Sequence, residues 1–302
     1  MLPDHAWKPW EPRFGFPIFK GVRLLLSFSV NPEYSPLKAS GIPSMLKGAM
    51  RNGFRGVRDL VVEHGTLLRT PHLGRRLEFR LIITTREGEF LGQRGVPGSY
   101  PPGGSIDIEV ADVLAKMGLP DDDYMGILVM SRGRPDGWRT SPGSYSMTYA
   151  TDRTVTTYRT GGFTRILNDP NRKKHVGFRG INPKALATDR HLSSILLINH
   201  SSNPAYDRHV TPDSTLLRAD GEQRTAVFGS IAPFGGVERD LEQLFGDDVV
   251  DFLAPFGGRG TVITTCQGVT LASIHVMRAR DGSSMSIDHS RPTHTYILNG
   301  VA

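Results

Sequence analysis

The chain contains 302 residues, of which 38% are hydrophobic and 22% are charged, and its formal net charge is +6. This composition excludes a disordered chain, and the lack of any run of about 18 apolar residues excludes a transmembrane helix. The single cysteine excludes an intramolecular disulfide, and the charged, proline-containing start of the chain argues against a secretory signal. We therefore expect a cytoplasmic protein whose positive charge favours encounters with anionic partners.

Residues 1–19 form an arm that is rich in aromatic and proline residues and includes Trp7 and Trp10. Aromatic rings of this kind are seldom left in water, so we expect the arm to pack on its own core or on a second copy of the chain. The arm thus favours a homodimer or another homo-oligomer.

A series of short patterns then occurs twice in the same order along the chain. Residues 24–34 resemble residues 196–206, because both are an apolar segment that runs into Asn-Pro-x-Tyr. Four further pairs follow: residues 101–104 with 233–236, 126–129 with 260–263, 146–153 with 284–291, and Tyr158 with Tyr296. Ordered self-similarity of this kind predicts a tandem duplication. The predicted parts are copy one at residues 20–160, a linker at 161–190 and copy two at 191–302.

Runs rich in β-branched residues indicate strands within each copy, and Asp-Gly dipeptides at 220–221 and 281–282 mark turns between them. The clearest runs are residues 79–84, 261–265 and 271–276. Each Pro-x-Gly-Gly pattern is followed by apolar residues three apart, which predicts one short helix per copy. These pairs are Val110 with Val113 and Leu241 with Leu244. The predicted fold class is mainly β, a tandem duplication of two antiparallel β-sandwich or jelly-roll-like domains.

Copy one contains an insertion at about residues 38–72 that has no counterpart in copy two. Between residues 45 and 61, apolar residues recur at helical spacing while basic residues form a separate stripe. The basic residues are Lys47, Arg51, Arg55 and Arg58. The pattern predicts a basic amphipathic helix, which would either bind nucleic acid, a membrane surface or a protein partner, or cover an edge of the sandwich.

Histidines are unevenly distributed between the two copies. The aligned part of copy two contains five of the chain's ten histidines, and the aligned parts of copy one contain none. Histidine is the commonest metal ligand and suits acid–base chemistry near neutral pH, so the asymmetry favours a site in copy two. Strand alternation places His289 on the same face as two apolar neighbours and makes it the leading candidate. The same alternation places His275 on an exposed face, outside the site.

The predicted site combines histidines with nearby polar residues of copy two. We assign catalytic roles to His289, His294 and Asp207, and substrate-binding roles to Arg291, Tyr206 and His209. A divalent transition metal, if bound, would use His200, His289 and His294 as ligands. No spacing among these residues is diagnostic, and the alternative is that they are surface or structural side chains. Arg291 matches Arg153 of copy one, which favours a role in the fold.

Several enzyme families are excluded, since the chain has no phosphate-binding loop, no nucleophile elbow and no dinucleotide fingerprint. Cys266 lies in a predicted strand, where a buried, unreactive thiol is expected. The first hypothesis is an enzyme, or a relict of one, that acts on a small polar or anionic substrate in copy two. The alternative is a non-catalytic binding or assembly protein that presents a glycan- or protein-binding surface on paired β-sandwiches. A third is nucleic-acid binding through the basic insertion.

Overall fold

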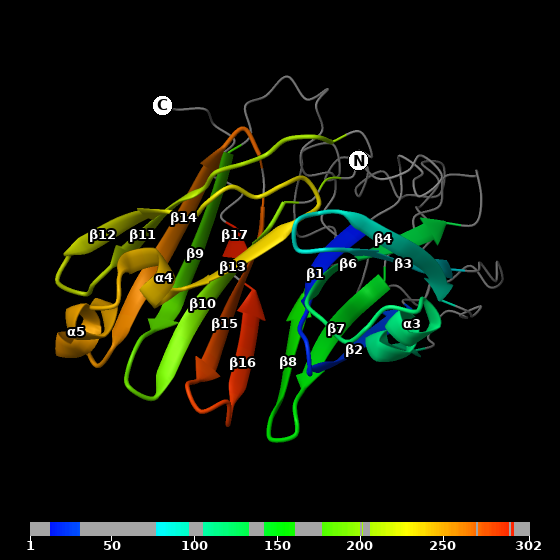
Figure 1. Ribbon diagram of the computed structural model, residues 1–302, viewed down its shortest axis with the longest axis horizontal. Coiled ribbons are helices and arrows are strands. Elements are labelled where there is room, and N and C mark those ends of the chain that lie inside the picture. The colour runs from blue at the N-terminus through cyan, green and yellow to red at the C-terminus, as the bar shows by residue number, and fades with distance from the viewer. Residues whose placement is uncertain are drawn as a thin grey trace, which may run out of the picture.

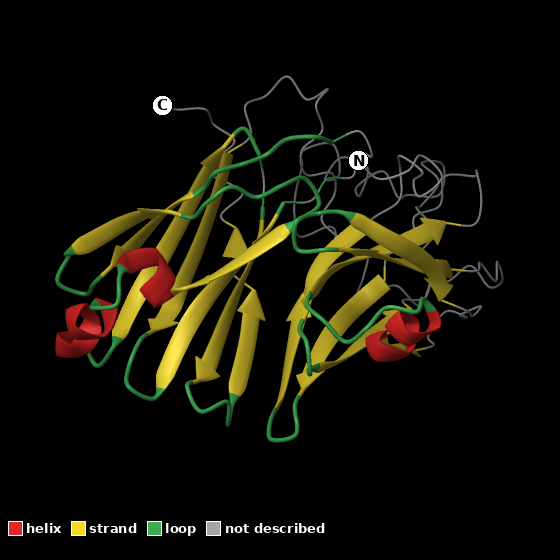
Figure 2. Ribbon diagram, viewed as in Figure 1, coloured by secondary structure: helices red, strands yellow, loops and turns green. Residues whose placement is uncertain are grey.

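The computed structural model describes residues 13–30, 77–96, 105–132, 142–160, 177–199, 201, 206–269, 271–289 and 291–292. Strands make up most of these residues and the helices are short, as Figure 2 shows. The prediction of a mainly β chain is therefore confirmed. Within the described ranges, no helix is long and apolar enough to cross a membrane. The predicted insertion at 38–72, with its basic helix, lies outside these ranges, as does most of the arm.

Residues 13–160, the first half of the molecule, form two four-stranded antiparallel sheets. The outer sheet has the order β1 (Arg13–Ile18), β6 (Tyr124–Arg132), β3 (Leu77–Thr84) and β4 (Phe90–Val96). The inner sheet has the order β5 (Ser105–Glu109), β2 (Arg23–Val30), β7 (Pro142–Ala150) and β8 (Val155–Thr160). Helix α3 (Val110–Lys116) follows β5 at the place where the sequence predicts a helix.

Residues 177–292, the second half, form a second pair of antiparallel sheets. The inner sheet has the order β13 (Gly236–Asp240), β10 (His191–Ile198), β15 (Ala272–Ala279) and β16 (Met285–His289). The outer sheet has the order β12 (Gln223–Val227), β11 (Asp213–Leu217), β14 (Arg259–Gln267), β9 (Gly177–Leu186) and β17 (Arg291–Pro292). Adding eight to each strand number of the first half gives the order in the second half, apart from the short β17 at one edge.

The second half holds two α-helices, α4 (Leu241–Phe245) and α5 (Val249–Leu253), and a 3₁₀ turn, η4 (Ala254–Phe256), so the prediction of one short helix per copy is wrong there. A capping box starts α4, because the Asp240 carboxylate accepts a hydrogen bond from the Gln243 N–H at 2.7 Å. Helix α5 buries Val249 and Leu253 in the core of the second half. These two residues are one helical turn apart, a signal that the sequence interpretation overlooked.

Two strands lie in segments where the sequence predicts no strand. β1 lies in the arm predicted for residues 1–19 and pairs with β6, and β9 lies in the linker predicted for residues 161–190 and pairs with β14. Both contain a proline, which suggested irregular structure. Pro17 is tolerated because β1 is at the edge of its sheet, and Pro183 lies at a register shift between β9 and β14.

The inner sheet of the second half is covered on both faces. Residues 193–198 of β10 are all buried, so this strand does not alternate between buried and exposed positions. Ile195 and Leu197 belong to the core between the two sheets of the second half. Leu196 and Ile198 belong instead to a core that includes the interior of the first half. Strands covered on both faces are expected to be largely apolar, and residues 195–198 of this strand are, whereas Ser193 and Ser194 are buried polar residues.

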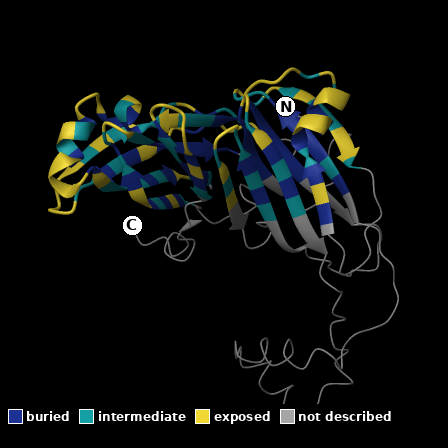
Figure 3. Cartoon of the chain, turned by 90° about the horizontal axis from the view of Figure 1, so that it is seen from below, coloured by how far each residue is buried: buried dark blue, intermediate teal, exposed yellow. Residues whose placement is uncertain are grey.

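The two halves share buried apolar surface. Figure 1 shows β8 of the first half lying beside β16 of the second, and the Ile287 N–H donates to the Thr156 hydroxyl at 3.4 Å. Figure 3 shows buried residues along the strands and exposed ones concentrated in helices and turns. A second contact places Tyr206 and Phe234 of the second half against Ile82 on the outer sheet of the first half. The halves are therefore held together at two separate places.

Candidate functional site

Two hairpin turns occupy corresponding places in the two halves. Residues 85–89 join β3 to β4, and residues 218–222 join β11 to β12. In each turn the first residue's N–H donates to the carbonyl of the fifth, and the fourth residue's N–H donates to the carbonyl of the first. The fourth residue is glycine with positive φ in both, Gly88 at 87° and Gly221 at 94°. The two turns therefore have the same backbone hydrogen bonding.

The turn at 85–89 docks against the second half. The Gly236 N–H donates to the Arg86 carbonyl at 2.9 Å, and the Thr84 hydroxyl donates to the Phe234 carbonyl at 3.1 Å. A Cβ at Gly88 would lie 2.1 Å from the Pro233 carbonyl oxygen, so only glycine fits there. Phe234 has a φ of 63°, a left-handed conformation that is uncommon for an aromatic residue. This contact, the junction, holds one half closely against the other.

A hollow of about 490 Å³ opens beside the junction, and we call it the junction hollow. Its charged and titratable lining comes from both halves: Arg86, Glu87 and Asp123 from the first, and His209, Glu238 and Arg239 from the second. Concave sites between two folded units, where a few polar side chains converge, are common places for ligand binding.

Glu238 is held in an ion pair beneath the junction hollow. Arg278 contacts both oxygens of its carboxylate, and the Ser194 hydroxyl donates to the same group. Burial tends to raise the pKa of Glu238, but the charge and hydrogen bonds of Arg278 and the bond from Ser194 outweigh it and hold the pKa below its usual value. Glu238 is therefore ionised and already neutralised, which makes it a poor general base.

Arg86 lies at the wall of the same hollow, with its side chain 16% exposed. Its guanidinium lies over the Phe19 ring, 5.4 Å from the centroid, and the guanidinium of Arg278 lies over the same ring at 5.0 Å. The nearest carboxylate oxygen, on Asp123, is 3.6 Å from the Arg86 Nη2, which is beyond hydrogen-bond range. Arg86 is therefore a largely buried cation that forms an ion pair with Asp123 but no hydrogen bond to it.

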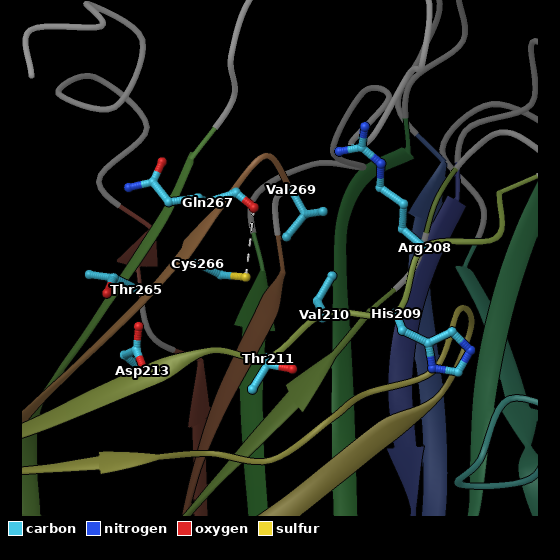
Figure 4. A pocket seen from close by; sticks show the side chains of 9 residues that line it. All are labelled: Arg208, His209, Val210, Thr211, Asp213, Thr265, Cys266, Gln267 and Val269. Atoms are coloured by element: carbon cyan, nitrogen blue, oxygen red, sulfur yellow. Dashed lines mark hydrogen bonds between the residues drawn. The ribbon is translucent and has the colours of Figure 1, made fainter.

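A second hollow, of about 390 Å³, lies at the end of the second half, and Figure 4 shows the side chains around it. Cys266 lines this end hollow and is 8% exposed, so the prediction of a buried thiol is confirmed. Burial raises the pKa of Cys266, and the charge of Asp213 raises it further. The thiol is therefore protonated near neutral pH, which makes it a poor nucleophile.

Tyr206, predicted to bind substrate, is part of the packing between the halves. Its side chain is 5% exposed, and its hydroxyl donates to the Asn199 Oδ1 at 2.6 Å. Burial raises the pKa of Tyr206 to about 12, against the opposing effect of that hydrogen bond. Asn199 in turn donates to three backbone carbonyls, those of Arg208, Ile231 and Ala232. Asn199 and Tyr206 thus tie the segments around Arg208 and Ile231 together.

The other predicted site residues are scattered or lie outside the described residues. Asp207 and His209 are exposed, and His209 lines both hollows. The backbones of His289 and Arg291 belong to β16 and β17, but their side chains are outside the described part of the chain, as are His200 and His294 entirely. No group of three potential metal ligands occurs among the residues that the structure describes. The catalytic and metal-binding assignments stay predictions.

His275, which strand alternation placed on an exposed face, is buried at 7% exposure, so that interpretation was wrong. Its Nε2 lies 2.9 Å from the Ser193 hydroxyl. Burial lowers its pKa to about 4, although the charge of Asp288 opposes the shift. Lys184 and Asp288 form an ion pair of 2.9 Å between the two sheets of the second half. Alternation failed here because both faces of the inner sheet are covered.

The sequence interpretation did not find Arg86, Glu238 or Arg278. The sequence held one usable signal, since residues 85–89 read Thr-Arg-Glu-Gly-Glu and residues 218–222 read Arg-Ala-Asp-Gly-Glu. An alignment of these two segments would have indicated a turn at residues 85–89, where Arg86 lies. The partners of Arg86 come from distant parts of the chain, and no local pattern indicates them.

Comparisons with known proteins give no relationship on which to build. No family model and no curated protein matches the chain. A glycosyl hydrolase family 2 member from Bacteroides cellulosilyticus aligns with 92% of the chain and 27% of its own length, at 7% identity and a TM-score of 0.19. A Bacteroides uniformis β-glucuronidase aligns with 91% of the chain and 26% of its own length, at 11% identity and a TM-score of 0.15. The chain thus spans about a quarter of each, and these TM-scores carry no argument.

Proposed function

We propose that the chain is a ligand-binding protein made of two tandemly duplicated, jelly-roll-like β-sandwich units, and that it holds a small polar or anionic ligand in the junction hollow. The observation that carries the proposal is the origin of the lining, because charged side chains of both halves meet in one concave site. Neither half alone supplies that set of side chains. Ligand sites between folded units are frequent for this reason.

The duplication is supported by two features that do not depend on each other. The strand orders of the two halves correspond position by position. The turns at 85–89 and 218–222 share their hydrogen bonding and the position of a glycine with positive φ. A shared fold alone would explain the matching strand orders. Descent from one ancestral unit would explain both the strand orders and the matching turns.

The junction hollow is favoured over the end hollow by its rigidity and charge. Gly88 and Pro233 are in close backbone contact at its margin, and Phe234 has a sparsely populated backbone conformation there. Such conformations persist only where surrounding structure fixes them, and they concentrate at functional sites. The end hollow is lined by the second half alone and contains the protonated thiol of Cys266.

The proposal is tested by filling each hollow in turn. Ser230→Trp places a large side chain in the junction hollow, and Thr211→Trp does the same in the end hollow; both native residues are exposed. Thermal stability of the full chain is measured against a panel of neutral sugars, amino acids, small carboxylates and phosphates. A compound that stabilises the native chain and Thr211→Trp, but not Ser230→Trp, supports the proposal. Stabilisation that survives Ser230→Trp contradicts it.

Catalysis in the second half is a second candidate, favoured by the exposed His209, which lines both hollows. The predicted catalytic residues His289, His294 and Asp207 and the predicted metal ligands would then act near this histidine. Elemental analysis of the purified chain and of His289→Ala tests the metal-dependent form. Near-stoichiometric metal that is lost in the variant would support it, and equal metal content in both would contradict it.

A further inference from the structure

We propose that Arg86 is the anchor of the junction hollow and that the ligand presents a compact oxyanion, a carboxylate or a phosphate group, to its guanidinium. The inference rests on the proposed function and names the chemical class of its ligand. It draws on the contacts of Arg86, on the corresponding turn of the second half, and on the distribution of charge around the hollow.

The donors of Arg86 are poorly matched inside the protein. Its Nη1 reaches only the Met125 sulfur, a weak acceptor, at 3.9 Å, and its Nη2 lies 3.6 Å from Asp123. Its Nε is buried and has no hydrogen-bond partner among the described residues. Burying a charged group without full hydrogen bonding is costly, so an arrangement of this kind needs a compensating role. A ligand oxyanion would supply acceptor oxygens to the exposed part of the guanidinium.

The turn at 218–222 shows that a largely buried arginine can still find hydrogen-bond acceptors for its donors. The Arg218 side chain is 14% exposed, close to the 16% of Arg86. Yet Arg218 donates to both oxygens of Asp220, at 2.6 to 3.1 Å, and to the Phe252 carbonyl at 3.0 Å. An arginine in this kind of turn can therefore be fully paired by its neighbours. Arg218 is the first residue of its turn and Arg86 the second, so the two side chains meet different surroundings, and those of Arg86 are at the junction hollow.

The carboxylates that line the junction hollow, Glu87, Asp123 and Glu238, form no hydrogen bond to Arg86 among the described residues. Glu238 is already paired with Arg278. Asp123 accepts a hydrogen bond from the Lys20 N–H at 2.8 Å, and its side chain is 51% exposed, so solvent weakens its attraction for Arg86. Of the two guanidinium groups that lie over Phe19, Arg278 has a hydrogen-bonded carboxylate, whereas Arg86 has only the half-exposed Asp123 at 3.6 Å.

An oxyanion fits this site better than a cation or a neutral sugar. A guanidinium presents parallel N–H donors that match the paired oxygens of a carboxylate or phosphate. A hollow of about 490 Å³ holds a compact molecule. The net charge of +6 favours the approach of an anion to the chain as a whole.

The inference is tested by calorimetric titration of the full chain with inorganic phosphate, acetate and a neutral methyl glucoside, at ionic strength held constant with chloride. We expect phosphate or acetate to bind, and Arg86→Gln to weaken that binding about 10- to 100-fold, as expected for losing a hydrogen bond to a charged group. Arg259→Gln is the matched control, because it removes an exposed arginine outside the hollow. Equal weakening by both variants would overturn the inference.

A second variant keeps the inference testable if Arg86→Gln does not fold. Asp123→Asn keeps an acceptor for the Lys20 N–H and removes the ion-pair partner of Arg86. It should tighten oxyanion binding about two- to fivefold, and unchanged or weaker binding would overturn the inference. Methyl glucoside binding that Ser230→Trp abolishes, with no phosphate or acetate binding, overturns the inference but leaves the proposed function standing. Binding of all three that Ser230→Trp does not affect contradicts both.

Discussion

The turns at 85–89 and 218–222 have the same backbone hydrogen bonds but different surroundings. The first is pressed against the second half, where Gly88 meets the Pro233 carbonyl oxygen. The second is exposed, and a Cβ at Gly221 would meet nothing within 4 Å. Local sequence determines the hydrogen bonding of such a turn, whereas its role depends on what it contacts. The junction is thus a specialisation of one turn out of two.

The interiors of the two halves differ as well. In the described part of the first half, the core between the sheets is apolar and includes Tyr149 with its hydroxyl bonded to the Pro17 carbonyl. The second half buries His275 and Ser193 between its sheets. Because strand order is the same in both, this fold accepts interiors of different polarity.

The largest difference is expected between two glycine substitutions. Gly88→Ala should lower the free energy of unfolding by about 2–5 kcal/mol, because it adds a steric overlap to an unfavourable left-handed backbone. Gly221→Ala should lower it by only about 1–2 kcal/mol, since its positive φ of 94° is unfavourable but its surroundings are open. Urea denaturation of both variants provides the measurement. Equal destabilisation would mean that the junction is not tightly packed.

The buried histidine makes the second half sensitive to acid. The pKa of His275 is lowered from about 6.5 to about 4 in the folded chain, so the unfolded chain takes up the proton first as pH falls. Its contribution is fully present above pH 6.5 and is lost as pH falls toward 4, by a total of about 3 kcal/mol. Denaturant unfolding between pH 7 and pH 4 measures this loss.

Other groups also titrate in this range, so a difference between variants is the informative quantity. His275→Gln keeps a polar partner for Ser193 and removes the proton uptake, so its stability should depend less on pH than that of the native chain. His209→Gln, which alters an exposed histidine, is the control and should retain the native pH dependence. A native pH dependence in His275→Gln would show that the buried imidazole is not the cause.

Removing one buried tyrosine hydroxyl from each half compares the strength of their polar contacts. Tyr149→Phe removes the hydrogen bond to the Pro17 carbonyl, and Tyr206→Phe removes the one to Asn199. Each should lower the free energy of unfolding by about 1 kcal/mol, because a buried acceptor loses its donor. Thermal denaturation gives the two values. An unchanged melting temperature in Tyr206→Phe would contradict the role of this contact in fixing the loop.

The smallest effect is expected at the ion pair between the sheets of the second half. Lys184 and Asp288 are 72% and 50% exposed, so their attraction is screened by solvent. Lys184→Met should change the free energy of unfolding by less than about 1 kcal/mol, and still less at high salt. Denaturant unfolding at low and high salt gives this value. A larger loss would mean that the pair, and not the apolar core, closes this edge of the sandwich.

The sequence was sufficient for much of the fold because local periodicity reports strands, short helices and glycine turns. It failed at β9, where Pro183 lies in a register shift that only the pairing with β14 reveals. The prediction failed at His275, because the alternation of residues along a strand assigns them to two faces without showing which face is covered. The junction could not be predicted from the sequence, because the hydrogen bond from the Thr84 hydroxyl to the Phe234 carbonyl joins residues 150 positions apart.

The position of a bound ligand tests the binding site at the junction most directly. Amide NMR spectra of the full chain, recorded during titration with phosphate and acetate, would locate the site without any substitution. We predict that the shifts of residues 85–89 and 230–239, one segment from each half, change together and saturate. Changes confined to residues 208–213 and 265–269 around the end hollow, or to a single half, would contradict a binding site at the junction.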